Sequence, residues 1–150
     1  MVTTICVAIL AVAAAFHFYW GAGGELGRSV SLPQFADGRP ISSIPSYGAH
    51  AVGLVLVASI AVVLAFGKQI ALPLPWWLVR ASMILLAVGF GARALSWHSY
   101  VGLFKKVRNT RFARYDTWLY SPLCLVLSFC LSLLVAAETS GSPAWPPSMP

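Results

Sequence analysis

Long apolar runs alternate with short polar segments along the chain. Four runs carry almost no charge, and Arg80 is the one charged residue inside them; the runs are Val2–Trp20, Ala49–Phe66, Trp76–Ala92 and Trp118–Ala137. A helix needs about 20 residues to cross roughly 30 Å of hydrocarbon. Backbone polar groups in lipid must be satisfied within the segment itself, which a helix achieves. The pattern therefore predicts four membrane-spanning helices.

The spacing of these runs predicts an all-α membrane protein, with four transmembrane helices packed in a bundle. We expect one domain over residues 1–137, with helices at about 2–20, 49–66, 76–97 and 118–137. A long loop joins the first two helices, and a basic interfacial segment joins the last two. Residues 138–150 are rich in proline and serine, a composition typical of a disordered tail.

Composition and charge agree with this interpretation and add an orientation. The chain is 59% hydrophobic and 9% charged, whereas a soluble domain carries about 25% charged residues. Seven Lys and Arg residues lie in loops 21–47 and 98–117, against two at the other side of the predicted bundle. Positively charged loops stay in the cytoplasm. We therefore expect these two loops to be cytoplasmic and both termini to lie outside.

The net charge of +6 is then explained by the membrane, so nucleic acid is not expected as a partner. The basic residues are better suited to contact anionic lipid head groups. The three cysteines, all in apolar runs, are Cys6, Cys124 and Cys130. They lack C-x-x-C spacing, and the histidines lack H-x-x-x-H spacing, so we expect no metal site and no cofactor.

Polar and aromatic side chains gather at the predicted cytoplasmic ends of the helices. The first helix closes with His17, Tyr19 and Trp20, and the third with Arg93, Trp97 and Tyr100. Asp116, Tyr120 and Ser121 open the fourth. Facing helices of a bundle build sites from such residues.

Arg93 and Asp116 stand out within this group. A charge inside a membrane is expensive and needs a partner. Asp116 is the one acidic residue near a helix on that side of the predicted bundle. We therefore predict that the two pair. Asp116 has a simpler interpretation as the N-cap of the fourth helix, since Asp satisfies free N–H groups there. The aromatic residues equally fit an interfacial belt.

Three segments resemble a bacterial family of small four-helix membrane proteins of unknown function. They read HFYWGAGG near the N-terminus, YVGLFKK after the third helix and FARYDTWLYSPLC at the fourth. The resemblance spans residues 16 to about 125. It implies a multi-pass protein of the bacterial plasma (inner) membrane, and it marks several of the polar residues above together with Lys105 and Arg114.

The favoured hypothesis is a site at the cytoplasmic helix ends that binds a small amphipathic or lipid-like molecule. His17 and Asp116 are the candidate catalytic residues, because together they provide acid–base chemistry. The candidate substrate-binding residues are Tyr19, Trp20, Arg93, Trp97, Tyr100, Lys105, Arg114, Tyr120 and Ser121. A catalytic site predicts a cavity shared by His17 and Asp116.

The alternative is a non-catalytic accessory or structural subunit, within a homo-oligomer or a larger membrane complex. In that case Arg93 and Asp116 form a clamp with no cavity beside them.

Overall fold

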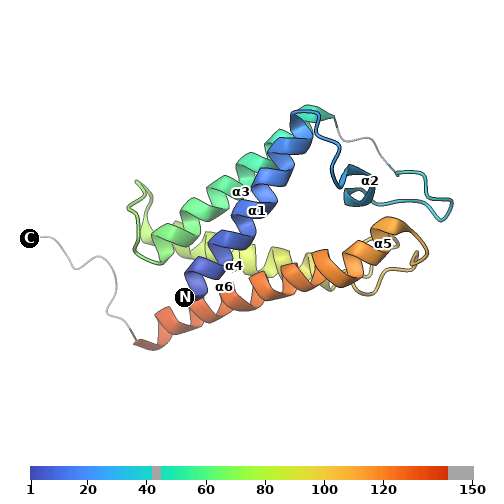
Figure 1. The fold of residues 1–150 in the computed structure, drawn as a ribbon. Helices are drawn as coiled ribbons and strands as arrows, with labels where there is room; N and C mark the ends of the chain where they lie inside the picture. The colour runs from blue at the N-terminus through green and yellow to red at the C-terminus, as the bar shows by residue number, and fades with distance from the viewer. Residues whose placement is uncertain (42–44, 142–150) are drawn as a thin grey trace, which may run out of the picture.

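The computed structural model is all-helical, and it describes residues 1–41 and 45–141 (Figure 1). Four helices are long and apolar enough to cross a membrane. They are α1 (Val2–Gly21), α3 (Ser46–Phe66), α4 (Trp76–Ala94) and the continuous helix Arg111–Gly141. The prediction of four long apolar helices is thereby confirmed, and their length and composition are those of a multi-pass membrane protein.

Prolines set two of the helix starts. Pro45 precedes α3 and Pro75 precedes α4, both with extended backbone angles. Proline has no N–H to lose and disfavours helical geometry in the residue before it, so it marks a helix start sharply. At its other end α4 finishes at Ala94, three residues before the predicted boundary of 97.

The last helix begins earlier than the apolar pattern indicates. Arg111–Gly141 consists of α5 (Arg111–Tyr115), the π-helical turn η1 (Asp116–Tyr120) and α6 (Ser121–Gly141). The N-cap is Thr110, whose hydroxyl accepts a hydrogen bond from the Ala113 N–H at 3.1 Å. Asp116 therefore lies inside the helix, and the prediction that it serves only as an N-cap is wrong.

The π-helical turn has a cause in the sequence. Pro122 follows η1 inside this continuous helix. A proline within a helix removes one backbone hydrogen bond, and its ring clashes with the carbonyl four residues earlier. Widening the preceding turn relieves both problems, because the backbone then bonds five residues apart rather than four. α6 runs on to Gly141, and the remainder of the predicted tail lies outside the described residues.

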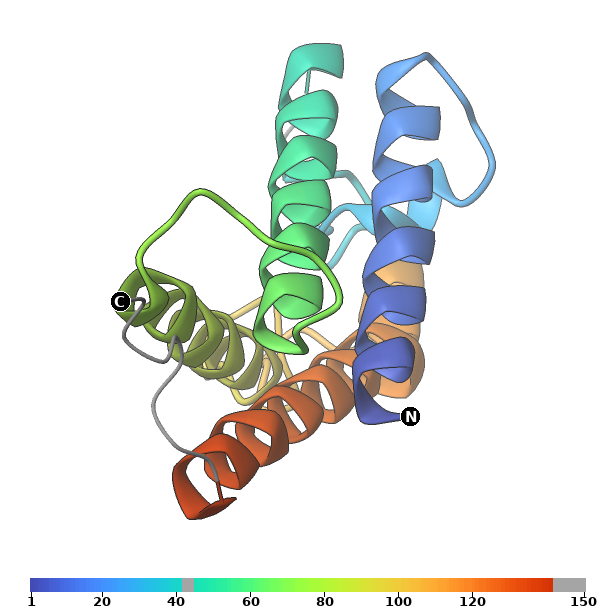
Figure 2. The same cartoon turned by 90° about the vertical axis from the view of Figure 1, so that its left-hand side faces the viewer.

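The long helices form two antiparallel pairs that are inclined to each other (Figures 1 and 2). α1 packs along α3, and α4 packs along α6. The start of α1 lies against α6, and the end of α3 lies near the start of α4. The core between the pairs contains small and medium side chains, among them Cys6, Leu10, Met83 and Leu131.

The two pairs diverge toward the ends at Gly21, Ser46, Ala94 and Arg111, which we call the basic end. The segment between α1 and α3 occupies this opening, and its short helix α2 (Arg28–Ser31) faces α5 (Figure 1). Gln34 fixes the segment in place. Its side-chain nitrogen donates to the Ser29 carbonyl at 3.0 Å, and its oxygen accepts from the Phe112 N–H at 3.2 Å.

Candidate functional site

The predicted pairing of Arg93 with Asp116 is confirmed, and Lys105 joins it. The Arg93 guanidinium donates to one oxygen of Asp116 at 2.8 Å. The Lys105 ammonium donates to the other oxygen at 3.0 Å. Asp116 is fully buried and Lys105 is 1% exposed. Lys105 therefore lies inside the protein. The sequence had suggested instead that it contacts a bound head group.

The loop between α4 and α5 closes over this ion-pair network. The Gly102 N–H donates to Asp116 at 2.9 Å, while the Gly102 carbonyl accepts from Lys105 at 3.0 Å. Lys105 also donates to the Thr117 hydroxyl at 2.7 Å. An ammonium has three protons, so these three acceptors satisfy it completely. We call Arg93, Gly102, Lys105, Asp116 and Thr117 the Asp116 cluster.

Gly102 has the backbone geometry that this closure requires. Its φ is +90°, and a Cβ at this position would lie 2.6 Å from the Ser96 carbonyl oxygen. Only glycine adopts such angles without strain. The loop can thus approach Asp116 closely enough for its backbone N–H to reach the carboxylate.

The charges of the Asp116 cluster do not cancel. Two cations surround one carboxylate, so the cluster carries a net charge of +1. Removing charges from water is costly, and a buried network is retained only when its hydrogen bonds are well made. Here they join three separate elements, namely α4, the loop after it and η1. Bonds across three elements are what the clamp interpretation predicts, although Nη1 of Arg93 is buried without a hydrogen-bond partner among the described residues.

His17 lies elsewhere, in a cavity of about 90 Å³ between α1, α2 and α3. We call it the His17 cavity, and it is lined by His17, Trp20, Arg28, Ser31, Leu32, Gly48, Ala49 and Val52. Asp116 does not line it. The structure therefore does not bring the two candidate acid–base residues together in this cavity, because the helix pairs that carry them diverge at the basic end.

Polar groups in the His17 cavity are held in place by local bonds. Nδ1 of His17 lies 2.8 Å from the Ala13 carbonyl, so a proton on Nδ1 donates there and Nε2 is left for other contacts. The Trp20 indole N–H donates to the Leu26 carbonyl at 2.7 Å. The rings of His17 and Trp20 meet edge to face, with centroids 5.3 Å apart.

Arg28 is the cation of this cavity. It is half-buried, and among the described residues no carboxylate pairs with its guanidinium. In the sequence Arg28 served only as a topology signal, and Ser31 and Leu32 were not among the candidate site residues. Nothing in the local pattern marks these residues, because they reach the cavity through the fold of the long loop.

The remaining predicted site residues serve separate contacts. The Tyr120 hydroxyl donates to the Val30 carbonyl at 3.2 Å, which ties η1 to α2. The Tyr19 hydroxyl accepts from the Leu26 N–H at 3.3 Å. Ser121 is fully buried, and its hydroxyl finds no hydrogen-bond partner within residues 1–41 and 45–141.

Three further predicted residues lie toward the surface. Trp97 is 77% exposed and stacks on Phe104 with centroids 5.4 Å apart. Tyr100 meets Phe35 edge to face at 5.9 Å. Arg114 is exposed on α5. The structure thus divides the predicted site into the Asp116 cluster, the His17 cavity and peripheral contacts.

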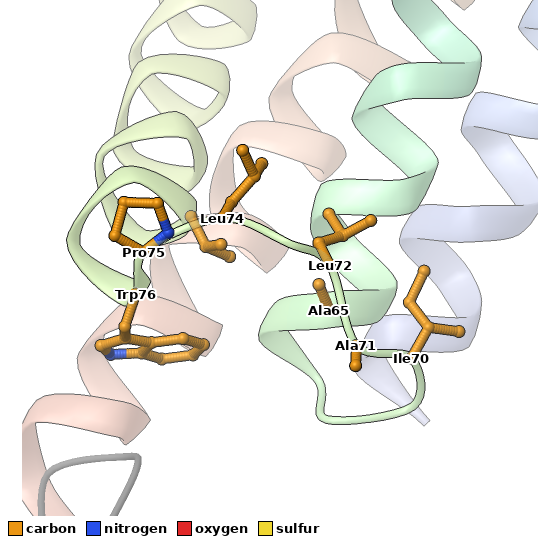
Figure 3. Close-up of a pocket in the computed structure, with 8 residues that line it drawn as sticks. Ala65, Ile70, Ala71, Leu72, Leu74, Pro75 and Trp76 are labelled. Carbon is orange, nitrogen blue, oxygen red and sulfur yellow. The ribbon is translucent and has the colours of Figure 1, made fainter.

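A larger hollow lies at the opposite end of the protein, beneath the turn that joins α3 to α4 (Figure 3). It measures about 230 Å³, and the side chains that line it are apolar apart from the indole nitrogen of Trp76. That nitrogen already donates to Glu138 at 3.4 Å. The hollow offers no charged or acid–base group, and within the described residues no group of three or more His, Cys, Asp and Glu side chains gathers that could hold a metal.

Comparison with known proteins gives one match. The model of the family described as "Protein of unknown function (DUF3995)" matches residues 10–131, which is most of the chain and includes both the Asp116 cluster and the His17 cavity. No curated protein and no solved structure matches the chain.

Proposed function

The chain belongs to the DUF3995 family, and from its geometry we propose that it binds a small amphipathic molecule with an acidic head group in the His17 cavity. The observation that carries this proposal is the composition of that cavity. A concave, largely apolar space with a few converging polar groups is the usual form of a small-molecule site. Here His17, Arg28 and Ser31 supply the polar groups.

Arg28 favours an acidic head. A guanidinium presents several donors in a fixed plane and binds carboxylate or phosphate oxygens in pairs. With the Nδ1 proton donated to Ala13, Nε2 of the neutral His17 ring is an acceptor, so it bonds to a hydroxyl or protonated oxygen of the head rather than to a charged one. The Ser31 hydroxyl donates to the Arg28 carbonyl at 2.9 Å, so its oxygen can only accept, from a hydroxyl or protonated oxygen of the head.

The size of the cavity favours binding of the head alone. About 90 Å³ holds a small polar group and leaves the rest of the molecule outside. Gly48 and Ala49 create this space, because larger side chains at these positions of α3 would fill it. Val52 lies at the edge and is 43% exposed, and Val55, one turn further along α3, is 62% exposed. An apolar tail would leave the cavity along this surface of α3.

We propose binding rather than catalysis. Asp116 is enclosed by its own partners, and a general base must reach the proton that it abstracts. The Asp116 cluster instead supports the site by fixing η1 to α4, and the long loop packs against η1 and α5. In this account the polar residues at the basic end have two roles, one in binding and one in holding the fold.

The experiment is the recovery of bound small molecules by mass spectrometry from protein purified in mild detergent. Wild type is compared with Arg28→Gln, and Arg39→Gln is the matched control, because Arg39 lies on the same loop and pairs with Asp37 at 2.7 Å. We expect an acidic amphipathic molecule from wild type and Arg39→Gln and its loss from Arg28→Gln. The same molecules from all three proteins would contradict the proposal. A co-purifying protein subunit in place of a small molecule would favour the accessory-subunit alternative.

A further inference from the structure

A hollow distinct from the two described above lies on the outer face of α5 and η1, and the proposed function does not use it. It measures about 440 Å³ and is lined by Arg111, Arg114, Tyr115, Trp118 and Leu119. These residues are spaced at i, i+3, i+4, i+7 and i+8, so they share one side of the helix. None of them lines the His17 cavity.

Arg111 and Arg114 have no counter-charge in the part of the chain that the structure describes. Three of the four carboxylates in the chain are engaged elsewhere: Asp37 by Arg39, Asp116 by the Asp116 cluster and Glu138 by Arg80. The backbone N–H and the guanidinium of Arg39 hold the pKa of Asp37 below its ordinary value. Within the described residues, no carboxylate forms an ion pair with Arg111 or Arg114.

The side chains along this face change from basic to aromatic to apolar. Arg111 and Arg114 come first, and Trp118, 79% exposed, follows one turn later. The exposed apolar side chains beyond it include Leu119, Leu123 and Val126. Tryptophan prefers the boundary between head groups and acyl chains. The order therefore matches that of a phospholipid, from its phosphate to its acyl chains.

We propose that this face binds an anionic phospholipid. The phosphate lies between Arg111 and Arg114, the indole of Trp118 lies at the level of the glycerol, and an acyl chain follows Leu119 and Leu123. Arginine suits this role because its planar group contacts two phosphate oxygens at once. The site favours a lipid with net negative charge, because the two guanidinium groups repel the ammonium of a zwitterionic head, whereas an anionic head presents its phosphate without such a cation.

The proposal predicts a preference that native mass spectrometry measures directly. The detergent-solubilised full chain is titrated with phosphatidylglycerol and, separately, with phosphatidylcholine of the same acyl chains. We expect phosphatidylglycerol to bind at least tenfold more tightly. Each basic residue near an anionic surface contributes about 1 kcal/mol, which is a factor of about five to six in affinity. The double variant Arg111→Gln/Arg114→Gln should therefore bind phosphatidylglycerol roughly thirtyfold more weakly.

Two matched variants distinguish binding at Arg111 and Arg114 from nonspecific attraction of the lipid by positive charge. Arg39→Gln/Lys106→Gln removes the same charge from the basic end and keeps the preference for phosphatidylglycerol. Arg111→Lys/Arg114→Lys retains the charge but loses the paired donors of the guanidinium groups, so we expect an affinity between those of wild type and the Gln pair. Unfolding temperatures establish that all variants are folded. Equal affinity for the two lipids, an equal loss in both Gln pairs, or displacement of the lipid by an equal concentration of inorganic phosphate would overturn the proposal. Because Arg28 is unchanged in every variant, failure here leaves the His17 cavity untouched.

Discussion

Lys105 and Asp116 form an ion pair that the protein encloses almost completely. Their charged atoms lie 3.0 Å apart, and the two side chains are 1% and 0% exposed. Arg93 approaches the same carboxylate from α4 at 2.8 Å. The pair therefore links the loop after α4 to the π-helical turn, and it fixes the geometry of the basic end.

Replacing Asp116 with Asn should destabilise the protein severely. The substitution leaves two cations next to each other without a counter-charge, and breaking a buried pair in this way costs about 3–5 kcal/mol. The unfolding temperature in detergent measures the effect. Asp37→Asn is the matched control, because it removes a carboxylate from an exposed pair, and we expect no measurable change there. Similar behaviour of the two variants would show that the Asp116 cluster is not a clamp.

Lys105→Met tests the net charge of the Asp116 cluster. The variant loses the hydrogen bonds from Lys105 to Gly102, Asp116 and Thr117. Asp116 and Arg93 remain as an ion pair, so the net charge of the Asp116 cluster falls from +1 to zero. We expect a loss of about 1–2 kcal/mol in unfolding free energy, smaller than that of Asp116→Asn. Urea or heat unfolding of the two variants side by side gives the comparison. A larger loss for Lys105→Met would contradict the charge argument.

Gly102→Ala should open the loop over Asp116. Its φ of +90° disfavours any side chain, and the new Cβ would meet the backbone oxygen of Ser96 at 2.6 Å. Gly38 provides the control, since its φ is +84° but a Cβ there has nothing within 4 Å. We expect about 1–2 kcal/mol from the backbone angle alone in Gly38→Ala and a clearly larger loss in Gly102→Ala. Equal losses would mean that the close approach at Ser96 is unimportant.

Gln34→Leu should loosen the loop that covers the basic end. The change leaves the buried Phe112 N–H without its acceptor, which costs about 1–3 kcal/mol. Trypsin cleavage after Arg28 or Arg39 reports this opening as a faster appearance of the corresponding fragments. Ser29→Ala is the control, because only the backbone carbonyl of Ser29 bonds to Gln34. Cleavage at the wild-type rate in Gln34→Leu would argue against this anchoring role.

The sequence predicted the membrane spans well because their signal is a sum over about twenty residues. It also predicted the contact between Arg93 and Asp116, since charges are rare enough in this chain to leave few choices. It did not predict that Lys105 is buried. Lys105 lies in an irregular loop, where no periodicity distinguishes an inward side chain from an outward one.

The start of the last helix was missed for a similar reason. Residues 111–117 are polar or aromatic apart from Ala113, so hydropathy alone placed the start at Trp118. Thr110 is nevertheless a good N-cap, and Pro122 marks a disturbed turn. The separation of His17 from Asp116 was not predictable either. Their convergence required four nearly parallel helices, and the inclination between the two pairs depends on long-range packing.

The most direct test of the account is a measurement of where an acidic amphipathic molecule binds. Dodecyl phosphate is titrated against the protein in mild detergent by isothermal calorimetry, in an Arg111→Gln/Arg114→Gln background that removes the second proposed site. The account predicts saturable binding that Arg28→Gln abolishes and that Arg39→Gln and a folded Lys105→Met retain. Binding that is unaffected by Arg28→Gln, or absent from the background protein itself, would contradict the assignment of the His17 cavity as the functional site.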